Sequence, residues 1–309
     1  MDVLRTLTSS RKKQPNIATK LPQEIGDKQS PQSAKSPSIS GSPTTSKSNF
    51  KIIAGVFPTE TIPEPLAKKC HSVLNLDYDA VTTVNKAFEH DIDYLFLIPS
   101  KSEERALQAK RLISVAVERN IKFICLECWL PNSDILNNVD IVNVDIEATG
   151  IPYTFLRCAP LQQNFLDMKA QFHKPLATIQ IPISTGGFAP VHARDVATAA
   201  SAVLADIKKH SGKVYRLTGP ELLTGVGIAG KASEGLERPV KFVNKPPPTT
   251  TGPSWAKFLD LELYSLIAKG FFTSVSNDML LLTGKKAISL EDFFKEHKAE
   301  FNQLSSSKL

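Results

Sequence analysis

The sequence predicts an α/β protein: a doubly wound parallel sheet with a smaller C-terminal lobe and a disordered Ser/Pro-rich insertion. Short apolar runs alternate with amphipathic helical segments from residue 50 onward, an order typical of a parallel sheet with helices on both faces. The 309 residues suffice for one large domain with an appended lobe. A low-complexity segment separates a short N-terminal stretch from this pattern.

The first strand of the sheet is predicted at Val3–Leu7, and the first helix is expected to begin within Asn16–Leu21. In a sheet of this type the first strand is central. Without it, two half-sheets would face each other with unpaired edges. Arg5 is an unfavourable residue inside such a strand. The alternative interpretation is that residues 1–20 form only a disordered start of the chain.

The insertion comprises residues 27–48, which contain eight serines and three prolines. Such a composition buries too little apolar surface to offset the entropy of ordering, so this segment is predicted to be disordered. Ser30, Ser36 and Ser42 each precede a proline. They are candidate sites for proline-directed phosphorylation; the simpler alternative is that disordered insertions are rich in Ser and Pro.

Four more strands are predicted after the insertion. Apolar runs at Phe50–Val56 and His71–Leu76 predict two of them, and Asp77 directly follows the second. The continuous run Tyr94–Ile98 is typical of a central parallel strand that is buried on both faces. Ile121–Leu126 predicts the next strand.

Two helices are predicted between these strands. The helix over residues 80–89 is expected to bury Val81, Val84 and Phe88, which have helical spacing. The helix over residues 102–120 is expected to be capped by Ser102 and to carry acids in its first turn. The acids are Glu103 and Glu104, and the apolar face comprises Leu107, Leu112, Ile113 and Ala116.

The turn after the predicted first strand contains no glycine. A dinucleotide-binding fold of this kind carries a Gly-x-x-Gly-x-x-Gly loop, because glycine permits the tight turn and the close approach of the pyrophosphate. Leu7, Ser10 and Lys13 occupy the three glycine positions. The sequence therefore predicts weakened or absent dinucleotide binding. Side chains of Arg11, Lys12 and Lys13 could hold a pyrophosphate instead, although a run of charges is more often a solvated surface.

The net charge of +6 belongs to the N-terminal region. Residues 1–51 carry nine Lys/Arg and three Asp/Glu, and the remaining residues carry 28 of each sign. No basic stripe on the folded core is therefore expected, and nucleic-acid binding is not predicted. No apolar stretch is long enough to span a membrane.

The expected location is the cytoplasm. The N-terminus lacks the apolar region of a secretory signal, and its Arg/Ser content resembles a mitochondrial transit peptide only faintly. The chain has four cysteines, a number that indicates a reducing compartment for a protein of this size.

Four segments, in this order and with similar spacing, resemble the NmrA-like family, atypical members of the short-chain dehydrogenase superfamily. They are Gly150–Arg157, Gly187–Ala197, Leu217–Leu223 and Thr283–Phe293. The resemblance covers residues 50–300. It implies an NAD(P)-binding Rossmann domain and a smaller C-terminal lobe that closes over a cleft at the strand ends.

The resemblance also implies a division of the chain. Residues 1–26 would hold the degenerate first strand and helix, and residues 27–48 the disordered insertion. Residues 49–220 would complete the Rossmann domain, and residues 221–309 would form the C-terminal substrate lobe. Members of the family include NADP-dependent reductases of quinones and related carbonyls, and regulators that bind a dinucleotide without evident catalysis.

The residues that usually transfer a proton in this superfamily are not found at the matching positions. A Tyr-x-x-x-Lys pair would place a lysine beside the phenol and lower its pKa. Between Cys128 and Arg157 the chain has no lysine, and its only tyrosine there is Tyr153. Tyr153 and Arg157 are interpreted as packing residues. Cys128 stands where the family has a serine, and a thiol is a weaker donor than a hydroxyl. No catalytic residue is predicted.

Several positions match the family's cofactor contacts. Phe57 replaces the basic residue that holds the 2′-phosphate in NADP-dependent relatives. Asp77 matches the acid beside the adenine, and Pro99 and Ser100 match the turn over the ribose. The loop Gln162–Asn164 would lie near the nicotinamide. The predicted cofactor-binding residues are Ser10, Lys13, Asp77, Pro99, Ser100, Cys128 and Asn164.

Other candidate residues have structural interpretations. Cys125 and Cys128 form a C-x-x-C on a strand, so they point to opposite faces and cannot share a metal. The six histidines have no ligand spacing, and His192 is expected to be a hydrogen-bonded structural residue. Asp195 is expected to cap a helix over residues 196–204, and Glu291 and Asp292 to begin the last helix.

The sequence thus favours a catalytically silent regulator or scaffold that senses NADP or NAD weakly, together with a protein partner. The alternative is an active NAD(P)-dependent reductase of quinones or carbonyls, since the nicotinamide itself can carry the chemistry. The sequence does not predict a substrate or an oligomeric state.

Overall fold

The computed structural model describes residues 51–57, 62–100, 102, 104–129, 145–173, 176–246 and 263–302. The predicted first strand, the loop at Ser10 and Lys13, and the Ser/Pro-rich insertion all lie outside the described residues. Those expectations therefore remain predictions.

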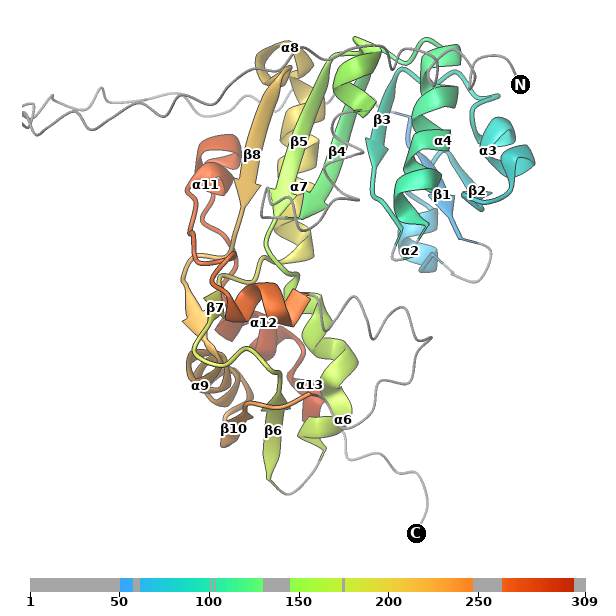
Figure 1. The fold of residues 1–309 in the computed structure, drawn as a ribbon. Coiled ribbons are helices and arrows are strands. Elements are labelled where there is room, and N and C mark those ends of the chain that lie inside the picture. Colours follow the sequence, from blue (N-terminus) through green and yellow to red (C-terminus); the bar gives the residue numbers. More distant parts are fainter. Residues whose placement is uncertain are drawn as a thin grey trace, which may run out of the picture. The chain divides into compact units, whose positions relative to one another are not determined.

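The main sheet is parallel and has the order β3-β4-β5-β8 (Figure 1). Its strands are β3 (Tyr94–Leu97), β4 (Phe123–Trp129), β5 (Tyr153–Cys158) and β8 (Lys213–Leu217). A second parallel pair joins β1 (Ile53–Val56) to β2 (Ser72–Asn75). The predicted strand order along the chain is confirmed.

Helices cover both faces of the main sheet. On one face, α3 (Val81–Ala87) and α4 (Arg105–Glu118) share a core with Ile124 and Leu126 of β4. On the other face, α7 (Ala193–Ala205) packs against Phe123 and the rest of the second core. This is the predicted doubly wound α/β arrangement, and it follows from the alternation of side chains along each buried strand.

The two parallel sheets are not joined by a strand in the described part of the chain. There, β1 pairs only with β2, and β3 pairs only with β4. Leu74 and Leu76 nevertheless pack against the same core as α3 and α4. One edge of β1 and one edge of β3 thus have no strand neighbour among the described residues.

Some local expectations for the helices are wrong. Val81 is 57% exposed and Leu107 is 46% exposed, although both were expected to be buried. Helix α4 starts at Arg105, so Ser102 does not cap it and no acid lies in its first turn. The Ser102 hydroxyl accepts the N–H of Glu104, 3.1 Å away, which keeps these residues in a turn before the helix.

The C-terminal part has small sheets and several helices. Strand β6 (Ala177–Gln180) pairs with β10 (Val240–Val243) in parallel, and β7 (Gly187–Phe188) pairs with β9 (Leu223–Thr224) in antiparallel fashion. The longest helix here is α9 (Gly225–Leu236). The shorter helices are α6 (Lys169–Phe172), α11 (Asp278–Thr283), α12 (Leu290–Glu296) and α13 (Lys298–Asn302).

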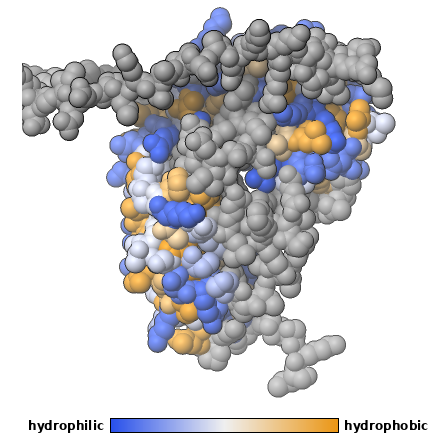
Figure 2. Space-filling view, viewed as in Figure 1, coloured by the Kyte–Doolittle hydropathy of each residue, from blue (hydrophilic) through white to orange (hydrophobic). Residues whose placement is uncertain are grey.

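Three further short helical segments are α2 (Glu64–Ala67), the 3-10 helix η2 (Gln162–Met168) and α8 (Ile207–His210). Residues 145–149 and 263–268 are helical as well. No helix among the described residues is long and apolar enough to cross a membrane. Hydrophilic and hydrophobic residues are intermixed over the described part of the face in Figure 2.

An aromatic cluster forms the centre of the C-terminal part. Its rings are stacked edge-to-face or tilted, with centroids 4.7 to 6.2 Å apart. Such pairs add stability beyond the burial of their area. The members of this cluster are Phe165, Phe172, Phe293, Phe294 and Phe301.

A glycine permits one close approach between segments. A Cβ at Gly219 would lie 2.3 Å from the carbonyl oxygen of Pro190, so any larger residue would push two backbone segments apart. Gly219 lies in the Leu217–Leu223 segment that resembles the family. The resemblance there reflects a packing requirement.

The helix caps confirm one expectation and correct another. Ser289 caps α12 and accepts the N–H of Asp292, and Glu291 lies in the first turn as predicted, although α13 follows as the last helix. Helix α7 starts at Ala193 and is capped by His192, not by Asp195. The expectation for Asp195 is wrong because its carboxylate accepts the N–H of Ile288, 93 residues away.

Candidate functional site

The carboxyl ends of β1, β2 and β3 carry several of the predicted cofactor residues. Phe57 follows β1, Asp77 follows β2, and Pro99 and Ser100 follow β3. Ligands of open parallel sheets bind outside these strand ends. We call this part of the molecule the carboxyl edge.

Phe57 and Tyr78 form an aromatic pair at the carboxyl edge. The ring centroids of Phe57 and Tyr78 are 4.7 Å apart, in an edge-to-face arrangement at 62°. The Tyr78 hydroxyl donates to the carbonyl oxygen of Ile98 at 3.4 Å. The ends of all three strands are therefore connected through Tyr78, and Phe57 presents an aromatic ring at this edge.

Two carboxylates follow β2. Asp77 Oδ1 accepts the N–H of Asp79 at 2.9 Å, and the Asp77 N–H donates to Thr83 Oγ1 at 3.1 Å. Asp79 Oδ2 accepts from Gln108 Nε2 at 2.7 Å, and its Oδ1 accepts from Arg111 at 2.8 Å. Asp77 is thus part of a turn, whereas Asp79 connects the turn to α4.

Gln108 connects Asp79, which follows β2, to Ser100, which follows β3. The Ser100 hydroxyl donates to Gln108 Oε1 and also accepts the N–H of Ser102 at 3.3 Å. Gln108 is only 2% exposed although its side chain is polar. Sequence reasoning missed Asp79, Gln108 and Arg111. The available signal was the i, i+3 spacing of Gln108 and Arg111, which places both side chains on one face of α4.

The polar groups of the carboxyl edge can accept hydrogen bonds from the adenosine half of a dinucleotide. Carboxylates can accept hydrogen bonds from the adenine amino group and the ribose hydroxyls. A 2′-phosphate would need a cation, and the guanidinium of Arg111 already donates to Asp79 and to the carbonyl oxygen of Tyr78. Phe57 offers no donor. Ser10 and Lys13, the residues predicted to contact the pyrophosphate, lie outside the described residues.

The cysteines of β4 and β5 are buried thiols. Cys125 packs in the core beneath α7, and Cys128 packs in the core beneath α3 and α4. The predicted placement on opposite faces is confirmed. Burial raises the pKa of Cys125 to about 12, and it raises the pKa of Cys158 well above the ordinary value. In the described part of the chain no group of His, Cys, Asp and Glu could hold a metal.

Tyr153 does not have the environment of a proton donor. Its hydroxyl bonds to Glu147 at 3.2 Å, and its ring stacks on Phe155 with centroids 4.5 Å apart. Burial, followed by the negative charge of Glu147, raises the pKa of Tyr153. A tyrosine that acts as a general acid near neutral pH needs the opposite shift.

The loop after β5 bonds to the C-terminal part. Gln162 is fully buried, and its Nε2 donates to the carbonyl oxygens of Pro190 and Ile288 at 3.0 and 2.9 Å. Gln163 Oε1 accepts the N–H of Ala193 at 2.9 Å. Both amides that were expected to face a ligand therefore bond within the protein. Asn164 is half-buried, and its proposed contact with a cofactor remains a prediction.

His192 has the predicted structural role. Its Nδ1 accepts the N–H of Arg194 at 2.9 Å, which requires an unprotonated Nδ1. Burial, followed by the charge of Arg194, lowers the pKa of His192. Burial raises the pKa of Asp195, partly offset by the hydrogen bond from Ile288.

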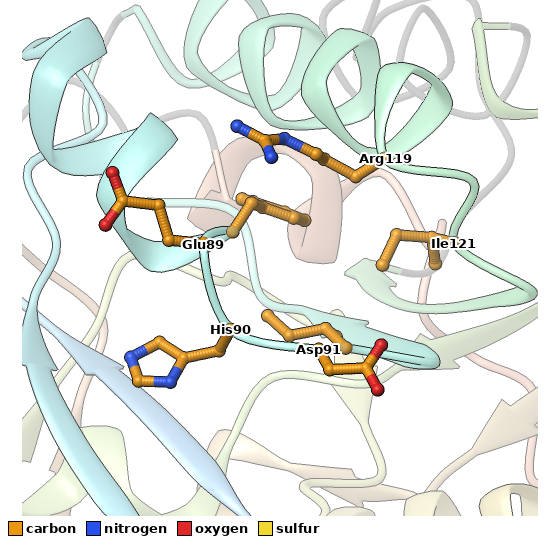
Figure 3. Close-up of a pocket in the computed structure, with 7 residues that line it drawn as sticks. Glu89, His90, Asp91, Arg119 and Ile121 are labelled. Carbon is orange, nitrogen blue, oxygen red and sulfur yellow. The ribbon is translucent and has the colours of Figure 1, made fainter.

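A pocket of about 270 Å³ lies at the opposite, amino end of the main sheet (Figure 3). It lies between the segments that follow α3 and α4. Its lining includes both acidic and basic side chains. None of the predicted cofactor residues lines it. Its lining comprises Phe88, Glu89, His90, Asp91, Ile92, Arg119 and Ile121.

Comparison with known proteins gives one curated relative and many solved structures. No protein-family model matches the chain. An NAD(P)H azoreductase of Xenophilus azovorans is 28% identical over 163 residues, which are 50% of this chain and 56% of that protein. The chain thus matches little more than half the length of this curated relative.

Two solved structures illustrate the likeness of fold. Triphenylmethane reductase of a Citrobacter species aligns with a TM-score of 0.66 and 22% identity, covering 80% of this chain and 90% of the reductase. The negative transcriptional regulator NmrA, solved in complex with NADP, aligns with a TM-score of 0.66 and 16% identity, covering 79% of this chain and 86% of the regulator. The predicted resemblance is confirmed: this chain has the Rossmann-like fold of NmrA and the NmrA-like reductases.

Proposed function

We propose that this protein is a dinucleotide-sensing regulator that does not catalyse hydride transfer. The observation that carries the proposal is the environment of Tyr153, the only tyrosine in the segment where the superfamily has its proton donor. Its hydroxyl bonds to Glu147, and its pKa is raised instead of lowered. Cys128, at the position of the family's serine, is 3% exposed and packs in the core.

The fold supports the dinucleotide part of the proposal. NmrA, a transcriptional regulator, was solved with NADP, so a protein of this fold can bind a dinucleotide in a regulatory role. Asp77, Pro99 and Ser100 lie together at the carboxyl edge, where parallel sheets bind such ligands. The binding is proposed to be weak because the loop at Leu7, Ser10 and Lys13 has no glycine.

The proposal includes a central strand between β1 and β3. We propose that Val3–Leu7 provides the central strand, because β1 and β3 each have an edge without a strand neighbour in the described structure. Ser10 and Lys13 would then follow that strand at the carboxyl edge. The readout of the sensor is proposed to be a protein partner in the cytoplasm, and the four cysteine thiols fit a reducing compartment.

An active reductase is the second candidate. The match to an NAD(P)H azoreductase over half of this chain favours it, and so does the shared fold with a triphenylmethane reductase. The absence of a tyrosine acid does not rule out a reaction that the nicotinamide carries by itself.

One experiment separates the two candidates. Binding of NADH and NADPH to the full chain is measured by calorimetry, and oxidation of each is then followed with a quinone and with an azo dye as acceptor. The proposal expects measurable binding of a dinucleotide without turnover. Sustained oxidation that depends on the protein would identify the reductase and refute the regulator.

A further inference from the structure

Resting on the proposed function, we infer that the carboxyl edge selects NAD(H) over NADP(H). The residues that determine this selectivity are Phe57 and the carboxylates of Asp77 and Asp79. The inference concerns the one chemical difference between the two ligands, the 2′-phosphate on the adenosine ribose.

The first step is the position of Phe57. In a dinucleotide-binding sheet the strand end near the adenosine ribose carries either an acid for the 2′-hydroxyl or a basic residue for the 2′-phosphate. Phe57 follows β1 at this strand end, and its ring packs edge-to-face on Tyr78. A phenyl ring has no hydrogen-bond donor, so a phosphate brought here would lose bonds to water without replacement.

The second step is the charge at the edge. Asp77 and Asp79 contribute two carboxylates that are two residues apart, whereas a phosphate monoester adds close to two further negative charges near pH 7. The cation of the described network, Arg111, is already paired with Asp79 at 2.8 Å. A 2′-phosphate would have to separate this pair or remain close to uncompensated carboxylates, and both cost free energy.

The carboxyl edge has hydrogen-bond acceptors that suit the adenosine of NAD(H). Asp77 Oδ1 accepts the N–H of Asp79 at 2.9 Å, and the carboxylate has a second acceptor oxygen, Oδ2. Ribose hydroxyls and the adenine amino group are donors, so a carboxylate oxygen can accept from them. The same oxygen repels a phosphate. The edge therefore distinguishes the two ligands by charge.

The test measures binding of NADH and of NADPH to the full-length protein by calorimetry. Wild type is expected to bind NADH about tenfold more tightly than NADPH, and Phe57→Arg is expected to tighten NADPH about tenfold while NADH changes by less than about threefold. Phe57→Leu is the matched control, since it removes the ring pair without adding charge, and should not favour NADPH.

A second variant probes the carboxylates without touching Phe57. Asp79→Asn removes one negative charge and releases Arg111, while the amide can still bond to Gln108. It is expected to tighten NADPH about threefold or more and to leave NADH nearly unchanged. Circular dichroism checks that each variant is folded.

The outcomes separate the inference from the proposed function. Wild type that binds NADPH as tightly as NADH contradicts the inference alone, and so does Phe57→Leu that behaves like Phe57→Arg. Wild type that binds neither ligand contradicts the proposed dinucleotide binding, and the inference falls with it because no site remains to select. If wild type binds NADH selectively and each variant changes NADPH binding as expected, the result supports both the inference and the proposed function.

Discussion

The two parts of the described molecule are stabilised in different ways. The C-terminal part is centred on five buried phenylalanines, and α9, α12 and α13 pack around them. The part that contains β1, β2 and β3 has short, half-buried strands, and Asp79, Gln108 and Arg111 form hydrogen bonds and one ion pair at their carboxyl ends. The C-terminal part is therefore expected to depend mainly on apolar packing, whereas the carboxyl edge is expected to depend mainly on polar contacts and charge.

The largest expected effect is in the aromatic cluster. Phe294 is fully buried against four other rings of the cluster, so Phe294→Ala should lower the free energy of unfolding by about 3–5 kcal/mol, because it leaves a cavity. Phe57→Leu is the counterpart at the carboxyl edge and should cost less than about 1.5 kcal/mol. Urea unfolding of both variants measures the contrast. Equal losses would mean that the two parts are equally dependent on packing.

The second prediction concerns the loop that lacks glycine. Replacing Leu7, Ser10 and Lys13 together by Gly should strengthen dinucleotide binding by about 2–3 kcal/mol, the scale of two or three charge-assisted hydrogen bonds. Stability should fall, because each Gly increases the entropy of the unfolded chain by roughly 0.5–1 kcal/mol. Calorimetry with NADH and NADPH measures the gain. A folded triple variant with unchanged affinity would show that residues 3–13 are not the phosphate loop.

Gln108 tests the hydrogen-bond network of the carboxyl edge. Gln108→Ala removes a donor to Asp79 and an acceptor for Ser100, so it should cost about 1–2 kcal/mol of stability. Gln108→Glu keeps the acceptor but places a carboxylate beside Asp79, and it should cost more. Thermal melts of both variants provide the comparison, and a Glu variant as stable as wild type would contradict the geometry of the bridge.

The smallest effect is a pH dependence in the C-terminal part. Since the pKa of His192 is lowered below 6.5, its contribution to stability is present above that value and is lost as the pH falls through the folded-state pKa. Asp195 acts in the opposite direction, because its raised pKa favours the folded state at lower pH. The other charges acting on His192 are those of Arg194, Glu296 and His297.

The variant His192→Asn isolates this contribution, because Asn can still cap α7 but does not titrate. Melting temperatures measured between pH 5 and pH 8 should show a smaller loss at low pH for the variant than for wild type. His210, whose pKa is also lowered by burial, should leave a residual slope in both proteins. Identical profiles would show that His192 does not contribute.

Local patterns in the sequence determined much of the framework. The apolar run at Tyr94–Ile98 predicted β3, and the spacing of Cys125 and Cys128 placed the two thiols on opposite faces of β4. Glu291 and Asp292 were correctly expected in the first turn of a helix. These outcomes depend on residues within a few positions of one another, so the backbone period of a strand or a helix is enough to decide them.

Tertiary structure decided which partners the polar side chains of the carboxyl edge and of the helix ends have. Asp79 finds Gln108 and Arg111 at separations of 29 and 32 residues, and Asp195 finds Ile288 at 93. The exposed positions of Val81 and Leu107 likewise depend on which neighbours cover each helix. The sequence by itself determined the order of strands along the chain, the absence of glycine from residues 3–13 and the aromatic residue at position 57. Only the folded chain decided which polar groups meet, because a hydrogen bond depends on distance in space and not along the chain.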